Sequence, residues 1–404
     1  MATTAPDDPA AVEVALLCNL PIGVLAWRAP EPTLTVLVKV TFSLREDGWA
    51  QLAVEQEPLT LDQPSELGEP GDLDRPSDFV PYKANADLLL AGGAYAAEPA
   101  QVIPAAFTID GLHKRFYALA GAPSIWAPLL PAYLRASPSS DSESVRVGAR
   151  ALWARAESDD GLLTAEGLPA RPLPRGFDYG LFNVAPEDQQ ARLLSTSAQL
   201  TLDGLTLGGL RRTVKLPGIR PRVFAFPARG AGHRTPPLEV VLRCDTLWID
   251  AGLEICTLTF RGLHVPEAGA SPLLLLAMDG RDETFSLAEA KRRLDDAVIS
   301  RALTPEDLRR RPAAEASPGP LLSEDTLPLS TSIPDLRSFL DNPGTPALGD
   351  PTMPLDATTA VDTIAQRRAL DSALPFSELP PPATPRISAF ALGGSRLAAT
   401  VLAA

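Results

Sequence analysis

The feature that most constrains the fold of this chain is a repeated strand pattern, in which short runs of alternating apolar and polar residues end at turn-forming residues. The run Thr33 to Phe42 is rich in β-branched residues and is followed by the turn Glu46-Asp47-Gly48. Two Asp-Gly pairs, at 110–111 and 203–204, lie within similar patterns. Alternation has the period of a strand, and Asp-Gly between strands is a strong hairpin signal. The sequence therefore predicts a mainly β fold.

The predicted strands fall into two blocks, residues 12–130 and 176–268, which are joined by a loop-rich segment. Many short strands at near-regular spacing are typical of packed β-sheets. We therefore expect an antiparallel, β-sandwich-like body over residues 12–275. Within one predicted strand, Gly92 and Gly93 indicate a bulge or a close approach of another segment.

Residues 285–311 carry a different pattern, which predicts two short amphipathic helices as a helical segment after the β body. Ser286 and Glu289 have the spacing of a capping box at a helix start. Thr304-Pro305 begins the second predicted helix, since proline suits the first helical position. Such helices either cover a sheet or dock a partner. The first helix is expected to place four residues on one face: Leu287, Ala290, Leu294 and Val298.

From residue 312 to 404 the composition changes to Pro, Ser, Thr, Ala and acidic residues. We expect a flexible, disordered Pro-rich tail, because such a segment buries too little apolar surface to offset its ordering entropy. Short apolar motifs next to proline recur in it, and they are either linear binding motifs or parts of a spacer. These motifs lie at 326–329, 332–334, 352–355 and 373–376.

The charge balance limits the classes of binding partner, and the cysteines indicate the cellular compartment. Fifty acidic residues against 36 basic ones give a net charge of -14, which argues against binding to nucleic acid or to anionic membranes. The three cysteines have no metal-ligand or paired spacing, so we expect reduced thiols in a cytoplasmic protein. The first ten residues lack the basic region of a secretory signal.

The motifs of common catalytic sites are missing from the sequence. There is no HExxH, no GxSxG elbow, no phosphate-binding loop and no GxGxxG after a strand. We therefore expect no catalytic residues, no cofactor and no metal. The alternative is a carbohydrate- or cation-handling enzyme that uses an acidic loop, although a solvated loop explains the same residues. The acidic residues of this loop are Glu66, Glu69, Asp72, Asp74 and Asp78.

Several motifs in a fixed order carry a resemblance to a known family. They are Pro81-Tyr82-Lys83, Asp87-Leu-Leu-Leu90, Gly92-Gly-Ala-Tyr95, the run from Phe182 to Gln190, and the run from Cys244 to Asp250. Over roughly residues 12–268, the chain resembles the bacterial family called domain of unknown function 2169, which is found beside type VI secretion genes. The resemblance implies a non-catalytic adaptor or chaperone that loads an effector toxin onto the secretion spike. Its partners would be the toxin, the spike protein or both.

These motifs also supply the candidate protein-binding residues. The run after Phe182 predicts either a turn that satisfies its own backbone or a polar recognition ridge around Phe182. A third hypothesis for the whole chain is a scaffold whose tail motifs do the binding, in which case deletion of residues 313–385 abolishes binding. The candidate binding residues are Tyr82, Lys83, Asp87, Tyr95, Phe182, Asn183, Asp188, Gln189 and Gln190.

Overall fold

The structure is a computed structural model, and the chain divides into two units, Met1–Gly319 and Pro320–Ala404. The expected tail with its apolar motifs, from residue 312 onward, lies outside the residues that the structure describes. The described residues all belong to the first unit, with only the backbone described at 134–135. They are 12–29, 31–45, 47–66, 68–129, 134–135, 146–153, 161–227, 236–266, 272–279 and 284–310.

The described residues form a mainly β fold, as predicted, with one sheet each of seven, six, five and three strands. The sheets are mixed, because three of the strand pairs are parallel while the others are antiparallel. Each parallel pair joins strands far apart in the chain, which hairpin signals cannot indicate. The parallel pairs are β1 with β20, β8 with β18 and β4 with β15.

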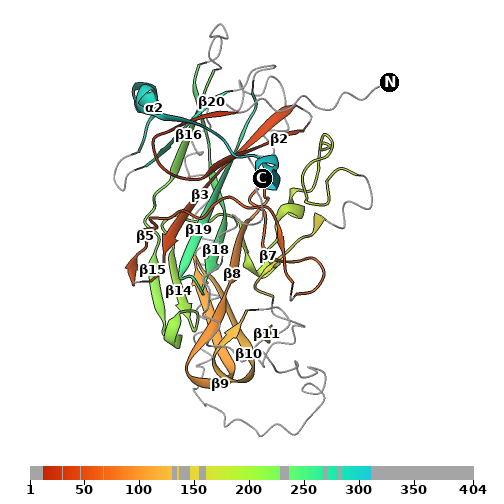
Figure 1. Ribbon diagram of the computed structural model, residues 1–404, viewed down its shortest axis with the longest axis vertical. Helices are drawn as coiled ribbons and strands as arrows, with labels where there is room; N and C mark the ends of the chain where they lie inside the picture. Colours follow the sequence, from red (N-terminus) through yellow and green to blue (C-terminus); the bar gives the residue numbers. More distant parts are fainter. Residues whose placement is uncertain are drawn as a thin grey trace, which may run out of the picture. The chain divides into compact units, whose positions relative to one another are not determined.

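The seven-stranded sheet lies at the centre of this unit (Figure 1), and its long strand β3 (Pro32–Ser43) contains the alternating run Thr33 to Phe42. Val36, Val38 and Phe42 of β3 point into the larger hydrophobic core. Lys39 and Thr41 point to the other face and are also buried. The remaining strands of the sheet are β13 (Gln190–Ala191), β8 (Ala86–Ala91), β18 (Arg243–Asp250), β19 (Ile255–His264), β2 (Ile22–Arg28) and β5 (Gln51–Leu52).

The six-stranded sheet is built on the long hairpin of β9 (Gly93–Ile109) and β10 (Leu112–Pro128). Asp110 and Gly111 form its turn with φ of 45° and 80°, so the hairpin predicted there is confirmed. Phe107 and Phe116 of this sheet belong to the same core as β3. The other strands are β11 (Leu134–Arg135), β14 (Gln199–Asp203), β15 (Arg212–Lys215) and β4 (Gly48–Trp49).

The five-stranded sheet carries the first helix of the predicted helical segment. Helix α2 (Leu287–Arg293) packs Ala290 into a small core that includes Phe224 and Leu275. The backbone N–H of Glu289 donates to Ser286 Oγ over 3.2 Å, which confirms the predicted helix start. In order across the sheet, the strands are β17 (Leu238–Val240), β16 (Pro221–Phe226), β20 (Leu273–Met278), β1 (Glu13–Leu16) and β21 (Val298–Arg301).

The predicted helical face is wrong at Val298. After α2 the chain makes one turn of 3₁₀-helix, η6 (Leu294–Asp296), and then forms β21 alongside β1. Two adjacent β-branched residues, Val298 and Ile299, favour a strand over a helix, and β1 offers the edge to pair with. The second helix, α3 (Pro305–Arg310), begins as predicted, and the hydroxyl of Thr304 donates to Asp307 over 2.7 Å.

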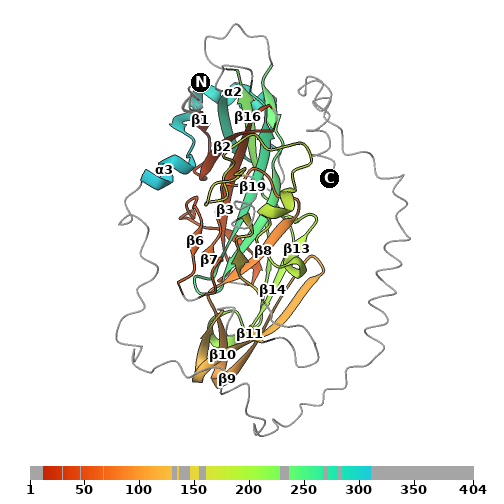
Figure 2. The ribbon, with the colours of Figure 1, turned by 90° about the vertical axis from the view of Figure 1, so that its right-hand side faces the viewer.

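A long segment, residues 53–85, covers the polar face of the seven-stranded sheet. Gln56 Oε1 accepts from the backbone N–H of Thr41 over 2.8 Å, and Lys39 Nζ donates to the carbonyl of Pro58 over 2.9 Å. Figure 2 shows β6 and β7 of this segment beside β3. A second core, which includes Leu37, Leu59 and Phe79, lies beneath it. Its three-stranded sheet consists of β12 (Ala149–Arg150), β7 (Asp72–Arg75) and β6 (Gln63–Pro64).

Candidate functional site

The two motifs from the sequence, near residues 81–90 and 182–190, lie side by side although roughly ninety residues separate them. Strand β13 pairs with β8, so that Gln190 lies opposite Asp87. Asn183 donates to the carbonyl of Asn85 over 2.8 Å and accepts from the backbone N–H of Asn85 over 3.1 Å. The 3₁₀-helices η3 (Tyr179–Phe182) and η4 (Glu187–Gln189) lead into and out of this contact. The two motifs therefore form one structural unit.

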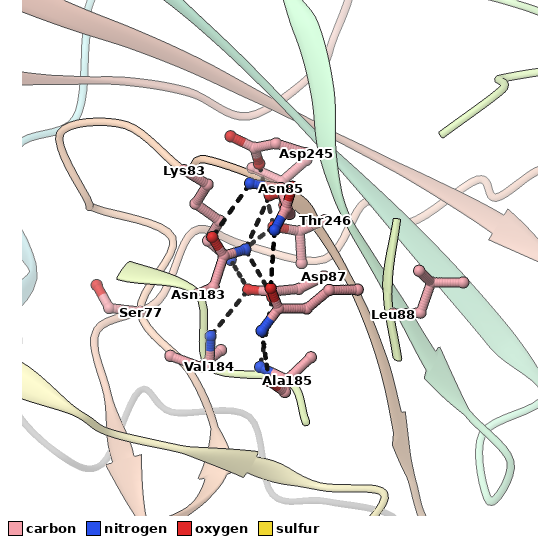
Figure 3. A network of polar contacts seen from close by, with 12 residues as sticks. Ser77, Lys83, Asn85, Asp87, Leu88, Asn183, Val184, Ala185, Asp245 and Thr246 are labelled. Atoms are coloured by element: carbon pink, nitrogen blue, oxygen red, sulfur yellow. Dashed lines mark hydrogen bonds and ion pairs between the residues drawn. The ribbon is translucent and has the colours of Figure 1, made fainter. Parts of the chain in front are cut away.

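Asp87 lies at the centre of this unit and is fully buried (Figure 3). Its carboxylate accepts from Lys83 Nζ over 2.7 Å and from Asn183 Nδ2 over 2.9 Å. It also accepts from the backbone N–H groups of Val184 and Ala185 over 3.1 and 3.3 Å. A buried charge is tolerated only when it is paired and hydrogen-bonded. Asp87 meets both conditions and fixes the second motif to the first.

The polar network continues across the sheet from Lys83. Lys83 Nζ donates to Thr246 Oγ1 over 2.8 Å, and Thr246 donates to Asp245 over 3.1 Å. Asp245 forms an ion pair with Arg261. Arg261 in turn donates to the carbonyl of Asp78 over 2.6 Å. A chain of polar groups therefore crosses the buried face of β18 and β19.

The network ends at a buried ion pair between Asp78 and Lys39. Asp78 also accepts from the backbone N–H of Thr60 over 2.9 Å and from the hydroxyl of Thr259 over 3.3 Å. Burial alone would raise the pKa of Asp78, but the Lys39 ammonium beside it holds that pKa below its usual value. The carboxylate is therefore ionised at neutral pH.

A small pocket lies between the two buried lysines, Lys39 and Lys83. Its volume of about 10 Å³ is at the lower limit for one water molecule. A pocket of this size does not admit a substrate. The pocket is lined by Lys39, Arg75, Pro76, Ser77, Asp78, Lys83, Thr246, Trp248, Thr257 and Thr259.

An aromatic cluster lies next to the network and is made of Trp27, Tyr82, Phe177, Tyr179 and Phe182. Tyr179 contacts Tyr82 and Phe177 edge to face, with ring centroids 5.7 and 5.4 Å apart. Trp27 and Phe182 are buried, whereas Tyr82, Phe177 and Tyr179 are partly exposed. Burial raises the pKa of Tyr179, so its hydroxyl stays protonated. The cluster thus presents rigid rings with polar ends to solvent.

Arg243 fixes the position of Tyr82 within the cluster. Its guanidinium lies 5.5 Å from the centre of the Tyr82 ring and donates to the Tyr82 hydroxyl over 3.0 Å. It also donates to the backbone carbonyls of Lys83 and Ala84 over 3.3 and 2.9 Å. One planar side chain therefore ties the exposed rings to the same segment that carries the buried network.

The candidate binding residues divide by burial. Five of them are buried, so a partner cannot touch them in this fold: Lys83, Asp87, Phe182, Asn183 and Gln189. Tyr82, Tyr95 and Gln190 are partly exposed and Asp188 is exposed, and their binding role stays a prediction. Because Phe182 and Asn183 are buried, the hypothesis of a polar ridge around Phe182 is wrong. The motif forms two 3₁₀ turns, and its side chains bond mainly to other segments: Gln189 donates to Leu88 O over 2.7 Å.

The glycine pair before Tyr95 has the close approaches expected of it. Gly92 has a φ of 93°, which side-chain-bearing residues rarely adopt, and it lies against the backbone of Gly252. At Gly93 a Cβ atom would overlap the indole of Trp126. Tyr95 lies opposite Trp126 in the β9–β10 pairing. The glycines therefore let the base of the long hairpin close.

The acidic loop does not gather its carboxylates. Asp72 is buried and paired with Arg146, and Glu69 lies 3.4 Å from the same guanidinium. Asp78 is paired with Lys39, while Asp74 is exposed. Within the described ranges, no three His, Cys, Asp or Glu side chains come together as metal ligands.

The choice of lysine over arginine in the sequence is related to the buried basic residues. Only five of the 36 basic residues are lysines. Three of them, Lys39, Lys83 and Lys114, are buried and paired with an aspartate. Arginine also occupies such a position, because Arg261 pairs with Asp245 in the same network. Each of the three lysines nevertheless marks a buried cation with an aspartate partner, whereas nothing comparable marked Tyr179 or Arg243.

Comparison with known proteins gives one match. The family model described as "Uncharacterized protein conserved in bacteria (DUF2169)" matches residues 29–156 and 148–261, which together are more than half of the chain. No curated protein and no solved structure shows a significant match to the sequence. Among the described residues, no helix is long and apolar enough to cross a membrane.

Proposed function

Because the chain belongs to the uncharacterised bacterial family DUF2169, we propose that it is a non-catalytic adaptor or chaperone of type VI secretion. In this proposal it binds an effector toxin, the spike protein or both in the cytoplasm and helps to load the toxin onto the spike. The resemblance of its motifs to proteins found beside type VI secretion genes suggests the secretion system. The structure supports the more general part of the proposal, which is protein binding.

The observation that carries the proposal is the partly exposed aromatic cluster of Tyr82, Phe177 and Tyr179 beside Arg243. Tyrosine, tryptophan and arginine are the residues that most often dominate the energy of protein interfaces. Their rings here are already packed against one another. Binding through them therefore costs little side-chain entropy.

The buried network gives this cluster a fixed base. Asp87 binds the segment that carries Val184 and Ala185, just after η3, while Lys83 binds Thr246 on the central sheet. These polar groups are bonded to one another rather than directed at a substrate-sized cavity. Such an arrangement suits a rigid binding surface, and it gives the enzyme alternative no support.

The test uses the full-length chain and the purified effector toxin and spike protein of the same secretion system. Titration calorimetry with each should show binding by the wild type. Tyr179→Ala should weaken that binding at least tenfold, or about 1.4 kcal/mol. Leu210→Ala is the control, because Leu210 is also exposed but lies outside the cluster. Equal affinity of the two variants would remove the cluster from the interface, and no binding by the wild type would overturn the adaptor function.

A further inference from the structure

Strand β21 (Val298–Arg301) is an apolar edge strand. It pairs with β1 on one side, and within the described part of the chain no strand pairs with its other side. All four of its residues are exposed. Val298 is 68% exposed and Ile299 is 46% exposed. An edge with unpaired backbone groups and exposed β-branched side chains is a template for another strand.

Both apolar layers of the five-stranded sheet end at this edge. Ile299 lies opposite Ala15, which is buried with Phe224 in the small core under α2. Val298 lies opposite Leu16, which packs against the larger core on the other face. Successive residues of a strand point to opposite faces, so Ile299 and Val298 continue one layer each. An added strand would extend both layers.

We propose that the occupant of this edge is β21 of a second copy of the chain, paired antiparallel across a two-fold axis normal to the sheet. Such an axis places one residue opposite its own copy. With Ile299 on the axis, the two Ile299 side chains meet, and Val298 lies opposite the second copy's Ser300. With Ser300 on the axis instead, Arg301 lies opposite Ile299, which is a poorer match.

Charge favours the register with Ile299 on the axis. Arg301 of each copy then lies opposite Ala297 of the other, close to the exposed Asp295 and Asp296 that precede it. Asp295 and Asp296 end the 3₁₀ turn η6 directly before Ala297, so both carboxylates lie one or two residues from the position that Arg301 faces. Among the described residues, Arg301 has one ion contact, which is to Asp307 over a long 3.8 Å. In a chain with a net charge of -14, such local complementarity offsets the general repulsion between copies.

The dimer is independent of the proposed adaptor function, since it uses no residue of the aromatic cluster. The first test is sedimentation equilibrium of the full-length chain, whose mass is 42.8 kDa. The wild type should approach twice this mass as its concentration rises. Ile299→Asp places two carboxylates opposite each other and should raise the dimer dissociation constant at least tenfold. Val241→Asp is the matched control, because this exposed valine follows β17 at the opposite edge of the same sheet.

Cysteine cross-linking tests the register. Ile299→Cys should give a disulfide-linked dimer under mild oxidation, because residues directly opposite in a strand pair have Cβ atoms about 4.5–5.5 Å apart. Ser300→Cys should not, since it faces Val298. The wild type measures the background from its own thiols, of which Cys244 and Cys256 are buried. A wild type that stays monomeric at every concentration, or cross-linking of Ser300→Cys without Ile299→Cys, would overturn the proposal.

Discussion

The ammonium group of Lys83 lies 2.7 Å from the carboxylate of Asp87, and the two side chains are only 2% and 0% exposed. This ion pair joins the loop before β8 to the strand itself, and through Asn183 and Val184 it also holds the second motif. These motif residues therefore act mainly inside the protein. What they support at the surface is the aromatic cluster around Tyr179.

Removing the carboxylate should strongly destabilise the protein. Asp87→Ala leaves the Lys83 charge buried without its counter-ion and removes one hydrogen bond from each of three other donors. We expect the free energy of unfolding to fall by about 3–5 kcal/mol, measured by urea denaturation. Glu289→Ala is the control, because it removes the pair between Glu289 and the exposed Arg292 on α2 and should leave the free energy of unfolding nearly unchanged. Equal losses in the two variants would contradict a supporting role for Asp87.

Replacing Arg243 by lysine should loosen the aromatic cluster while keeping the charge. An ammonium cannot reproduce the planar set of bonds to the Tyr82 hydroxyl and to the carbonyls of Lys83 and Ala84. We expect Arg243→Lys to lose about 1–2 kcal/mol of stability and to reduce the near-ultraviolet circular dichroism of the aromatic side chains. Arg211→Lys, at an exposed position, should change neither. An unchanged aromatic spectrum in Arg243→Lys would show that the cluster is held by ring packing alone.

A methyl group at Gly93 should disturb the base of the long hairpin. The new Cβ would overlap the Trp126 indole, so either the ring or the β9–β10 pairing must move. We expect Gly93→Ala to cost about 1–3 kcal/mol and to shift the tryptophan fluorescence. Gly121→Ala, in the same hairpin, is the matched control because a Cβ there meets open space. If both variants melt at the wild-type temperature, the contact with Trp126 does not constrain position 93.

The strand pattern predicted much of the β fold. It did not predict that the polar face of β3, which carries part of the network, is buried. Alternation in Thr33 to Phe42 indicates a polar face that meets water. Lys39 and Thr41 are instead buried, because residues 53–85 cover them. That covering segment has little regular structure of its own, so its sequence has no period that would reveal its position. Burial by an irregular segment is a tertiary effect that local patterns do not encode.

The candidate site was predictable only where its partners are close in sequence. Lys83 and Asp87 are four residues apart, a spacing at which two opposite charges can pair locally. Thr246 and Arg243 reach the same site because β18 pairs in parallel with β8. A parallel pair between strands so distant depends on the packing of the whole unit. The aromatic cluster was missed for the same reason, since Trp27, Tyr82 and Tyr179 come from three separate segments.

Asp62 should make stability depend on pH near neutrality. Burial raises the pKa of this carboxyl to about 7, although the backbone N–H of Ser77 donates to it over 2.6 Å. Lys83 lowers this pKa, whereas Asp78 and Glu166 raise it. In the unfolded chain Asp62 ionises at about its ordinary pKa of 3.9. Between these two values the folded protein binds the extra proton, so this contribution to stability falls as pH rises from about 4 to about 7.

Asp62→Asn isolates this contribution, because the amide oxygen still accepts from Ser77 while the charge is gone. Above pH 7 the variant should be more stable than the wild type by about 1–2 kcal/mol. This gain is smaller than the gain expected at a fully buried carboxylate, because water reaches part of the Asp62 side chain. Below about pH 4 the two should converge. His264 acts in the opposite direction, since burial lowers its pKa to about 4. Because His264 is present in both proteins, its contribution cancels when their free energies of unfolding, measured by urea denaturation at each pH, are subtracted. A difference that does not change with pH would show that Asp62 is ionised in the folded protein throughout this range.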